Sequence, residues 1–171
     1  MKVSYEILKC LFIFPVLIQA QDSPKVCNDQ GTCFKGSLIE PGIATFQGIR
    51  YAQPPIEELR FKSPIRINQD NLGTIDVSEI STVKCPQLGD PFVIGQEDCL
   101  LLNIYMPETA FENPDDKLPV MFWIHGGSLT AGSNNYAQYG PKHLVEKNVI
   151  VVHINYRLGP LGKACFWHVM N

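Results

Sequence analysis

The 171-residue sequence lacks several features that mark common functional classes. Its formal net charge of −3 offers no basic surface for nucleic acid. It has no Cys-x-x-Cys pair and only four scattered histidines, so we predict no metal site, and no cofactor is implied. After the first twenty residues, no apolar run approaches the length needed to cross a membrane. With 45% hydrophobic residues, the chain could bury one ordinary core.

The first twenty residues have the layout of a secretory signal peptide. Lys2 and Lys9 flank a short polar start, Cys10–Ile18 is apolar, and Gln19-Ala20 offers a small residue for cleavage. The alternatives are a membrane anchor, for which the apolar stretch is short, or an N-terminal core helix. We therefore predict that residues 1–20 are a signal peptide and that the protein is secreted.

Cysteine usage agrees with an oxidising compartment. Cleavage of the signal peptide leaves five cysteines, so one thiol lacks a partner within the chain. Cys27 and Cys33 flank a turn sequence and could close a small hairpin, and a bond between Cys85 and Cys99 would stabilise the chain by about 3 kcal/mol. Four cysteines allow three connectivities, and the residues alone do not choose among them.

The sequence Pro119–Gly132 is the segment around which we organise the functional interpretation. Val120–Ile124 is an unbroken apolar run, which predicts a strand buried on both faces. His125-Gly126-Gly127 then turns the chain, and backbone N–H groups in such a glycine turn can hold the oxyanion that develops during acyl transfer. The alternative is a strand followed by a plain glycine turn.

The flanking segments predict an α/β arrangement. Gly140–Asn148 has the pattern of a helix, with Pro141 in its first turn and Leu144 and Val145 facing inward, and Val149–Asn155 is the next strand. A strand, helix and strand in this order indicate parallel pairing. Earlier in the chain we expect the strands Gly36–Glu40 and Ile43–Phe46, joined by the Pro41-Gly42 turn. The double proline makes Gly48–Pro55 a loop or an edge segment, and Glu97–Pro107 contains a strand closed by a proline.

Four blocks of sequence, in order, resemble the N-terminal part of the type-B carboxylesterase (cholinesterase-like) family of α/β-hydrolases. They are Gly48–Pro55 with Arg60-Phe61, Glu97–Pro107, Phe122–Gly127, and Asn155–Gly159. The resemblance covers Val26 to Gly162. It implies an α/β fold, namely an incomplete α/β-hydrolase fold with the N-terminal strands of a mostly parallel sheet that stops before the nucleophile elbow. We accordingly assign residues 21–162 to this domain and residues 163–171 to a tail without family resemblance.

The resemblance also implies site residues. The backbone N–H groups of Gly127 and Ser128 match the loop half of the oxyanion hole, supported by His125 and Gly126. The hydroxyl of Ser128 is not expected to be a nucleophile, nor His125 a general base.

Two structural pairings are implied as well. Cys85 and Cys99 match the family's first disulfide, and Arg60 and Glu97 match a structural salt bridge. The loop between the two cysteines has Phe92 as its only aromatic residue, whereas cholinesterases place there a tryptophan that binds quaternary ammonium. The chain therefore resembles general carboxylesterases more than choline-ester specialists.

The catalytic triad is the missing part of this resemblance. A serine esterase of this kind needs a Gly-x-Ser-x-Gly elbow, followed in the sequence by an acid and a histidine. No Gly-x-Ser-x-Gly sequence occurs in the 171 residues. Cys165, in the tail, is not expected to replace the serine. The sequence thus predicts a truncated secreted carboxylesterase, inactive as this chain, whose full-length parent would act on small carboxylic esters. The alternative is a non-catalytic binding or adhesion relative.

The same resemblance predicts an association hazard. In the family's sheet, the strand before His-Gly-Gly lies beside the strand that carries the nucleophile. Without that neighbour, Val120–Ile124 would keep one unpaired edge, so we expect the truncated chain to self-associate or to be retained by chaperones.

Overall fold

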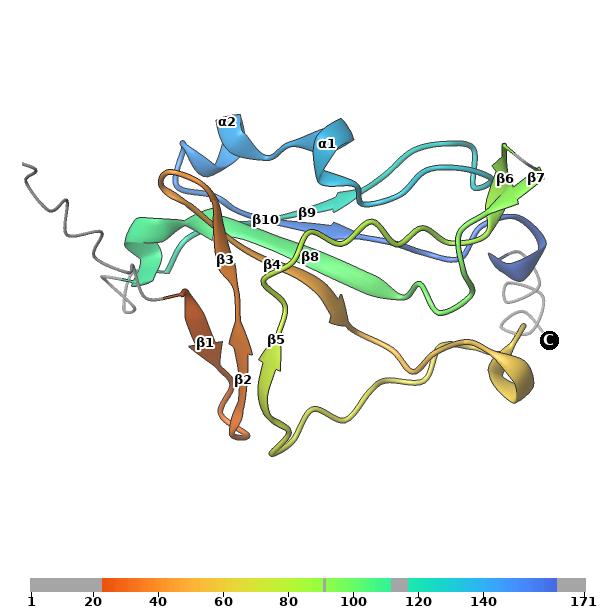
Figure 1. The fold of residues 1–171 in the computed structure, drawn as a ribbon, viewed down its shortest axis with the longest axis horizontal. Coiled ribbons are helices and arrows are strands. Elements are labelled where there is room, and N and C mark those ends of the chain that lie inside the picture. Colours follow the sequence, from red (N-terminus) through yellow and green to blue (C-terminus); the bar gives the residue numbers. More distant parts are fainter. Residues whose placement is uncertain (1–22, 91, 112–116, 163–171) are drawn as a thin grey trace, which may run out of the picture.

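The computed structural model describes residues 23–90, 92–111 and 117–162. The predicted signal peptide, the 163–171 tail and Cys165 lie outside these ranges. Within them, a five-stranded sheet forms the centre of the molecule (Figure 1). Its strands, in spatial order, are β3 (Ser37–Glu40), β4 (Ile43–Arg50), β8 (Leu101–Pro107), β10 (Ile150–Ile154) and β9 (Val120–Ile124).

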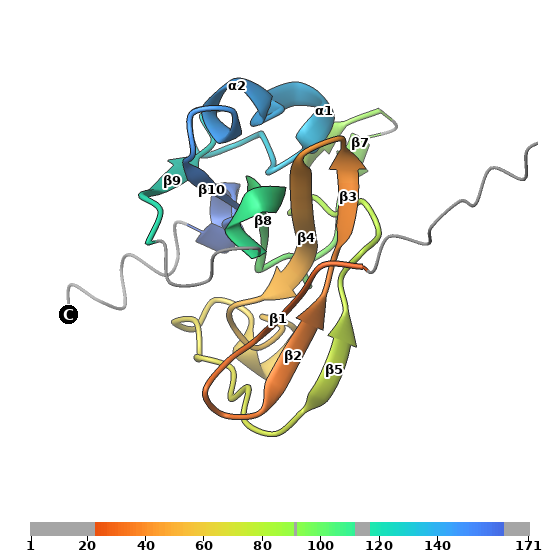
Figure 2. The ribbon, with the colours of Figure 1, turned by 90° about the vertical axis from the view of Figure 1, so that its left-hand side faces the viewer.

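Smaller elements surround this main sheet. A three-stranded sheet contains β1 (Lys25–Cys27), β2 (Thr32–Lys35) and β5 (Gly73–Asp76), and a hairpin contains β6 (Gln87–Gly89) and β7 (Phe92–Ile94). The helices are α1 (Tyr136–Tyr139) and α2 (Lys142–Val145), with 3₁₀ turns η1 (Glu57–Leu59) and η2 (Glu108–Phe111). Figure 2 shows α1 and α2 on one side of the main sheet and the β1-β2-β5 sheet on the other.

The prediction of a mostly parallel sheet is wrong for the residues that the structure describes. In the main sheet only β9 and β10 pair in parallel, and β3–β4, β4–β8 and β8–β10 are antiparallel. The pairing direction of β3 and β4 follows from their connection, because a turn as tight as Pro41-Gly42 can join only antiparallel neighbours. The α1–α2 segment joins β9 to β10 in parallel, as predicted.

The C-terminal boundary of β4 also differs from expectation. Gly48–Arg50 is predicted as loop or edge, but it continues β4 and pairs with β8, past an irregularity in the register between Phe46 and Ile49. Gly48 adopts a φ of 75°, and its N–H donates to the side chain of Asn103 at 2.9 Å. Glycine therefore lets the strand bend and resume, while the double proline acts only after Arg50.

The strand β9 forms where predicted, but its burial was predicted wrongly. All five of its side chains are exposed, between 41% and 62%. The strand lies at the edge of the main sheet and pairs only with β10. An apolar run indicates a buried strand only when both of its faces and both of its edges have neighbours.

The predicted helix over Gly140–Asn148 is shorter in the structure, spanning Lys142–Val145. Val145 is buried against Tyr105 and Val151, as expected of its inward side, whereas Leu144 is 39% exposed. In this short helix Val145 faces the sheet, and the adjacent residue Leu144 faces away from it. In the described ranges, no helix is long and apolar enough to cross a membrane.

His153 is a buried titratable group in the centre of the main sheet. Its ring lies 5.3 Å from that of Tyr105 and 6.4 Å from that of Trp123, and its Nδ1 has no hydrogen-bond partner among the described residues. Burial lowers the pKa of His153 to about 4. The neutral form is therefore favoured in the folded state.

We expect this histidine to make the protein less stable in acid. Because the pKa is lower in the folded state than the usual value of about 6.5, the unfolded chain binds more protons between these pH values. The free energy of unfolding should therefore fall by about 2–3 kcal/mol as the pH drops from 6.5 to 4. Urea unfolding at a series of pH values should show this loss in the native chain and not in His153→Phe. The exposed His143 provides the control, and a His143→Gln variant that also abolished the pH dependence would contradict this assignment.

Candidate active site

The loop after β9 has the backbone of an anion-binding turn. Gly127, Ser128 and Leu129 have φ values of 114°, 53° and 60°, three successive residues in the left-handed region. Successive N–H groups in such conformations can form a concave site for an anion. Neither the Gly127 nor the Ser128 N–H donates a hydrogen bond to another residue in the described part of the chain. Both donors are therefore available to a bound oxygen.

The turn is closed by its own backbone, and this requires glycine at position 127. The Gly127 carbonyl accepts hydrogen bonds from the N–H groups of Thr130 and Ala131, at 3.0 and 3.1 Å. A Cβ added at Gly127 would lie 2.0 Å from the Ala131 carbonyl oxygen. Any side chain at this position would open the turn and move its N–H groups.

His125, at the start of the loop, is held by the segment after β10. Its ring is buried and stacks on Tyr156, with centroids 4.3 Å apart and planes at 17°. The Tyr156 hydroxyl donates to the His125 carbonyl at 2.7 Å. The Leu129 carbonyl accepts from the Gly159 N–H at 2.7 Å. The segment after β10 thus holds the loop at two points.

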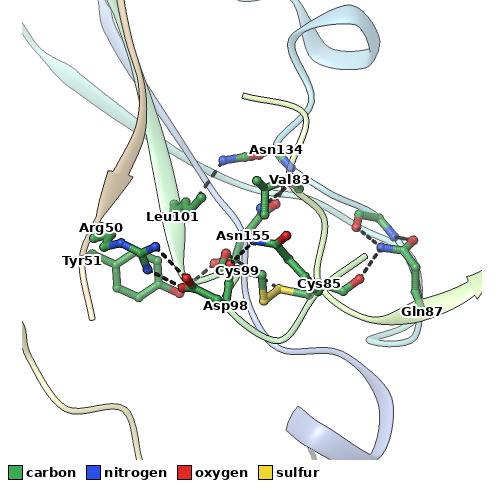
Figure 3. The surroundings of a disulfide bond; sticks show 12 residues. Arg50, Tyr51, Val83, Cys85, Gln87, Asp98, Cys99, Leu101, Asn134 and Asn155 are labelled. Carbon is green, nitrogen blue, oxygen red and sulfur yellow. Dashed lines mark hydrogen bonds and ion pairs between the residues drawn. A yellow bond between two sulfur atoms is a disulfide. The ribbon is translucent and has the colours of Figure 1, made fainter. Parts of the chain in front are cut away.

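Gln87 holds the far end of the loop, and sequence reasoning did not identify it. Its amide accepts a hydrogen bond from the Gly132 N–H and donates one to the Gly132 carbonyl, both at 2.9 Å. The same amide donates to the Cys85 carbonyl at 3.0 Å (Figure 3). Gln87 therefore links the disulfide to the oxyanion loop. No spacing rule points to it, because its partner lies 45 positions away in the sequence.

Both disulfides considered from the sequence are present. Cys27–Cys33 joins β1 to β2, and Cys85–Cys99 closes the segment that contains the β6–β7 hairpin. Arg60 Nε also lies 2.6 Å from Glu97 Oε2, so the implied salt bridge forms, with both side chains partly exposed.

A second ion pair beside the disulfide was missed. Arg50 and Asp98 form a bidentate pair, with Nη2 and Oδ2 2.6 Å apart, and the carboxylate raises the pKa of Arg50 (Figure 3). Both residues lay inside the blocks that carry the resemblance. Their pairing could not be predicted, because several charges of each sign lie nearby in the sequence.

Asn155 directly follows β10 and connects three segments of the chain. Its fully buried side chain accepts from the Asn134 N–H at 2.8 Å and donates to the Val83 carbonyl at 2.9 Å. Its carbonyl accepts from the Tyr51 hydroxyl at 2.7 Å, and burial raises the pKa of Tyr51 to about 12 (Figure 3). These bonds fix the segment that supports the oxyanion loop.

A cavity of about 620 Å³ lies beside this loop. Gly126 and Ser128 line it, while Gly127 does not. The other walls are mainly apolar and aromatic, and include Tyr51, Leu100, Ile124, Leu129 and Tyr156. The size and character of the cavity suit a small, largely apolar molecule with one polar group directed at the loop.

The described residues do not contain a nucleophile and base in contact. The ring of His125 has the Gly126 carbonyl as its polar contact, at 2.8 Å, and no serine hydroxyl bonds to a histidine ring in residues 23–90, 92–111 and 117–162. In the same ranges, no three His, Cys, Asp or Glu side chains gather as metal ligands. The described residues thus offer two available N–H donors in the loop after β9 but no nucleophile and base in contact.

Comparison with known proteins relates this chain to carboxylesterases. The Carboxylesterase family matches residues 30–167. A carboxylic ester hydrolase of Bombus ignitus is 41% identical over 154 residues, which are 84% of this chain and 27% of that protein. Esterase B1 of Culex pipiens is 36% identical over 138 residues, which are 75% of this chain and 23% of that protein.

Solved structures show the same relationship. The juvenile hormone esterase of Manduca sexta, with OTFP covalently attached, superposes with a TM-score of 0.69 and 33% identity, over 82% of this chain and 27% of that one. A PNB esterase gives a TM-score of 0.67 and 36% identity, over 82% and 28%. This chain spans about a quarter of the length of these relatives. With the match covering most of its length, the chain belongs to the carboxylesterase family of α/β-hydrolases.

Proposed function

We propose that these residues serve as the N-terminal, oxyanion-binding part of a secreted hydrolase of small carboxylic esters. The observation that carries the proposal is the loop from His125 to Gly132, with two uncommitted N–H groups beside an apolar cavity. In such a hydrolase a serine attacks the ester carbonyl, and the negative oxygen that forms is held by backbone N–H groups. The Gly127 and Ser128 N–H groups would supply this stabilisation. No Gly-x-Ser-x-Gly elbow occurs in the 171 residues, so we infer that the triad lies outside them.

Secretion is part of the proposal. The layout of residues 1–20 is that of a signal peptide, and two disulfides are typical of an oxidising compartment. The alternative, a non-catalytic binding relative, is less favoured, because a purely adhesive surface has no need of an oxyanion loop. The relatives described above are also esterases and hydrolases.

We further propose that the 171-residue chain self-associates or is retained by chaperones. The exposed strand β9 supports this, since an apolar edge of this kind is a template for pairing with another chain. The exposed apolar side chains of β9 are also the kind of surface that chaperones bind.

A chimera tests the catalytic part of the proposal. Residues 23–162 would replace the matching segment of the para-nitrobenzyl esterase of Bacillus subtilis, which is 38% identical to this chain over 133 residues. If the loop is an oxyanion hole, the chimera should hydrolyse p-nitrophenyl acetate within about tenfold of the parent enzyme, because the parent supplies the triad. A folded chimera that binds a serine-directed phosphonate but shows no turnover would contradict the proposal.

A further inference from the structure

Each N–H group of the proposed oxyanion hole is oriented by the carbonyl of its own peptide unit. A peptide unit is planar, so the Gly127 N–H points opposite to the Gly126 carbonyl, and the Ser128 N–H points opposite to the Gly127 carbonyl. The Gly127 carbonyl is held inside the turn by the Thr130 and Ala131 N–H groups. The direction of the Gly127 N–H depends instead on what fixes the Gly126 carbonyl.

Gly132, at the far end of the loop, packs against this carbonyl. A Cβ added to Gly132 would lie 2.6 Å from the Gly126 carbonyl oxygen and 2.3 Å from Nδ1 of His125. The same Nδ1 lies 2.8 Å from the Gly126 carbonyl oxygen. The two ends of the loop therefore meet without space for a methyl group. A displacement of Gly132 would change the surroundings that keep the Gly126 carbonyl in place.

Gln87 is the side chain that fixes Gly132. Its amide oxygen accepts from the Gly132 N–H, and its amide nitrogen donates to the carbonyls of Gly132 and Cys85 (Figure 3). All three bonds are 2.9 to 3.0 Å long. Cys85 is buried and joined by a disulfide to Cys99, which is also buried. Gln87 thus reaches the loop from a buried and cross-linked part of the chain.

We propose that Gln87 is a positioning residue for ester hydrolysis. Its amide holds Gly132 against the start of the loop, and Gly132 keeps the Gly126–Gly127 peptide in the direction that the oxyanion requires. This inference rests on the proposed function, because it concerns the same site. Gln87 does not line the cavity beside the loop. Its effect should therefore appear in the transition state and not in the binding of the ester.

Substitution of Gln87 in the chimera described above tests the role. Gln87→Met keeps the length of the side chain and removes all three hydrogen bonds. We expect kcat to fall by about 10–100-fold, because a displacement of the N–H groups by about 1 Å is enough for such a loss, while KM changes by less than about twofold. Gln87→Glu should lose at least as much, because its carboxylate can only accept hydrogen bonds and would face two carbonyl oxygens.

Gln96→Met is the matched control. Gln96 lies in the same disulfide loop, and its amide donates to the Asp98 carbonyl at 2.9 Å. The substitution removes a glutamine bond from this loop without touching Gly132, so kcat should stay at the value of the unsubstituted chimera. An equal loss of kcat in Gln96→Met and Gln87→Met would assign the effect to the disulfide loop in general and overturn the proposal.

A transition-state analogue separates positioning from a general loss of folded protein. A trifluoromethyl ketone forms an oxyanion when the catalytic serine adds to its carbonyl, so its inhibition constant should rise by the same factor as kcat/KM falls. A smaller folded fraction would lower the apparent kcat and leave the inhibition constant unchanged. An inhibition constant that does not change in Gln87→Met, or a kcat that does not fall, would overturn the proposal.

Amide hydrogen exchange in the full 171-residue chain tests the hold on the loop without reference to activity. In Gln87→Met the Thr130 and Ala131 N–H groups should exchange about tenfold faster, since the turn that they close is released at Gly132. The amides of β8 should exchange as in the native chain, which verifies that the main sheet is intact. Unchanged exchange of Thr130 and Ala131 would overturn the proposal.

The two measurements distinguish this inference from the proposed function. If the loop amides exchange faster but the unsubstituted chimera shows no turnover, Gln87 holds the loop and the proposed function fails, and the catalytic role of Gln87 fails with it. An active chimera whose kcat is unaffected by Gln87→Met supports the proposed function and rejects the positioning role.

Discussion

The 171-residue chain, expressed without additions, should hydrolyse p-nitrophenyl acetate no faster than the buffer blank. Loss of a triad nucleophile or base lowers the rate of a serine hydrolase by about 10⁶-fold, and no elbow serine is present here. The proposed oxyanion loop would not compensate, because it would act on an intermediate that needs a nucleophile to form. His125 is held against Tyr156 and the Gly126 carbonyl, so it has no serine to activate.

The measurement compares the native chain with the same chain after heat denaturation. The para-nitrobenzyl esterase of Bacillus subtilis serves as the positive control for the assay. Any turnover above the blank should disappear on treatment with a serine-directed organophosphate, which would identify it as a contaminating esterase. Turnover that copurifies with the chain and survives this treatment would contradict the prediction and direct attention to Cys165.

Gly127→Ala in the chimera should lower kcat by about 10²–10³-fold and change KM little. The loss of one oxyanion-hole donor has an effect of this size. The reason here is steric, since the added Cβ would lie 2.0 Å from the Ala131 carbonyl oxygen and the backbone is held at a φ of 114°. The turn must open, and the N–H groups move away from the oxyanion.

Gly42→Ala provides a matched control for backbone strain. Gly42 also has a positive φ, 82°, but a Cβ there would meet no atom within 4 Å, and it lies in the β3–β4 turn. This variant should lose stability and keep its kcat. Ser128→Ala should also keep its kcat, because the Ser128 contribution is its N–H. If Gly42→Ala lost as much kcat as Gly127→Ala, the loss would reflect general instability and not the oxyanion loop.

The sequence predicted those features that depend on residues close together in the chain. The apolar runs predicted β9 and β10, the Pro41-Gly42 turn predicted the β3–β4 hairpin, and the helical segment predicted parallel pairing of β9 with β10. These features depend on neighbouring residues, whose conformational preferences are the same wherever the segment lies. By contrast, β5 and the β6–β7 hairpin were not predicted, because their short segments have weak patterns and form by pairing with distant or looped partners.

The sequence by itself determined the order of the main elements, the glycine turn after β9 and the absence of an elbow serine. Only the tertiary structure decided that all five side chains of β9 are exposed, that Gln87 clamps Gly132, and that Arg50 pairs with Asp98. The physical reason is that burial and hydrogen-bond partners depend on which segments meet in space. Gln87 and Gly132 lie 45 residues apart, so no local pattern records their contact. The composition of β9 permits a buried strand, and its exposure in the described residues depends on which segments pack against it.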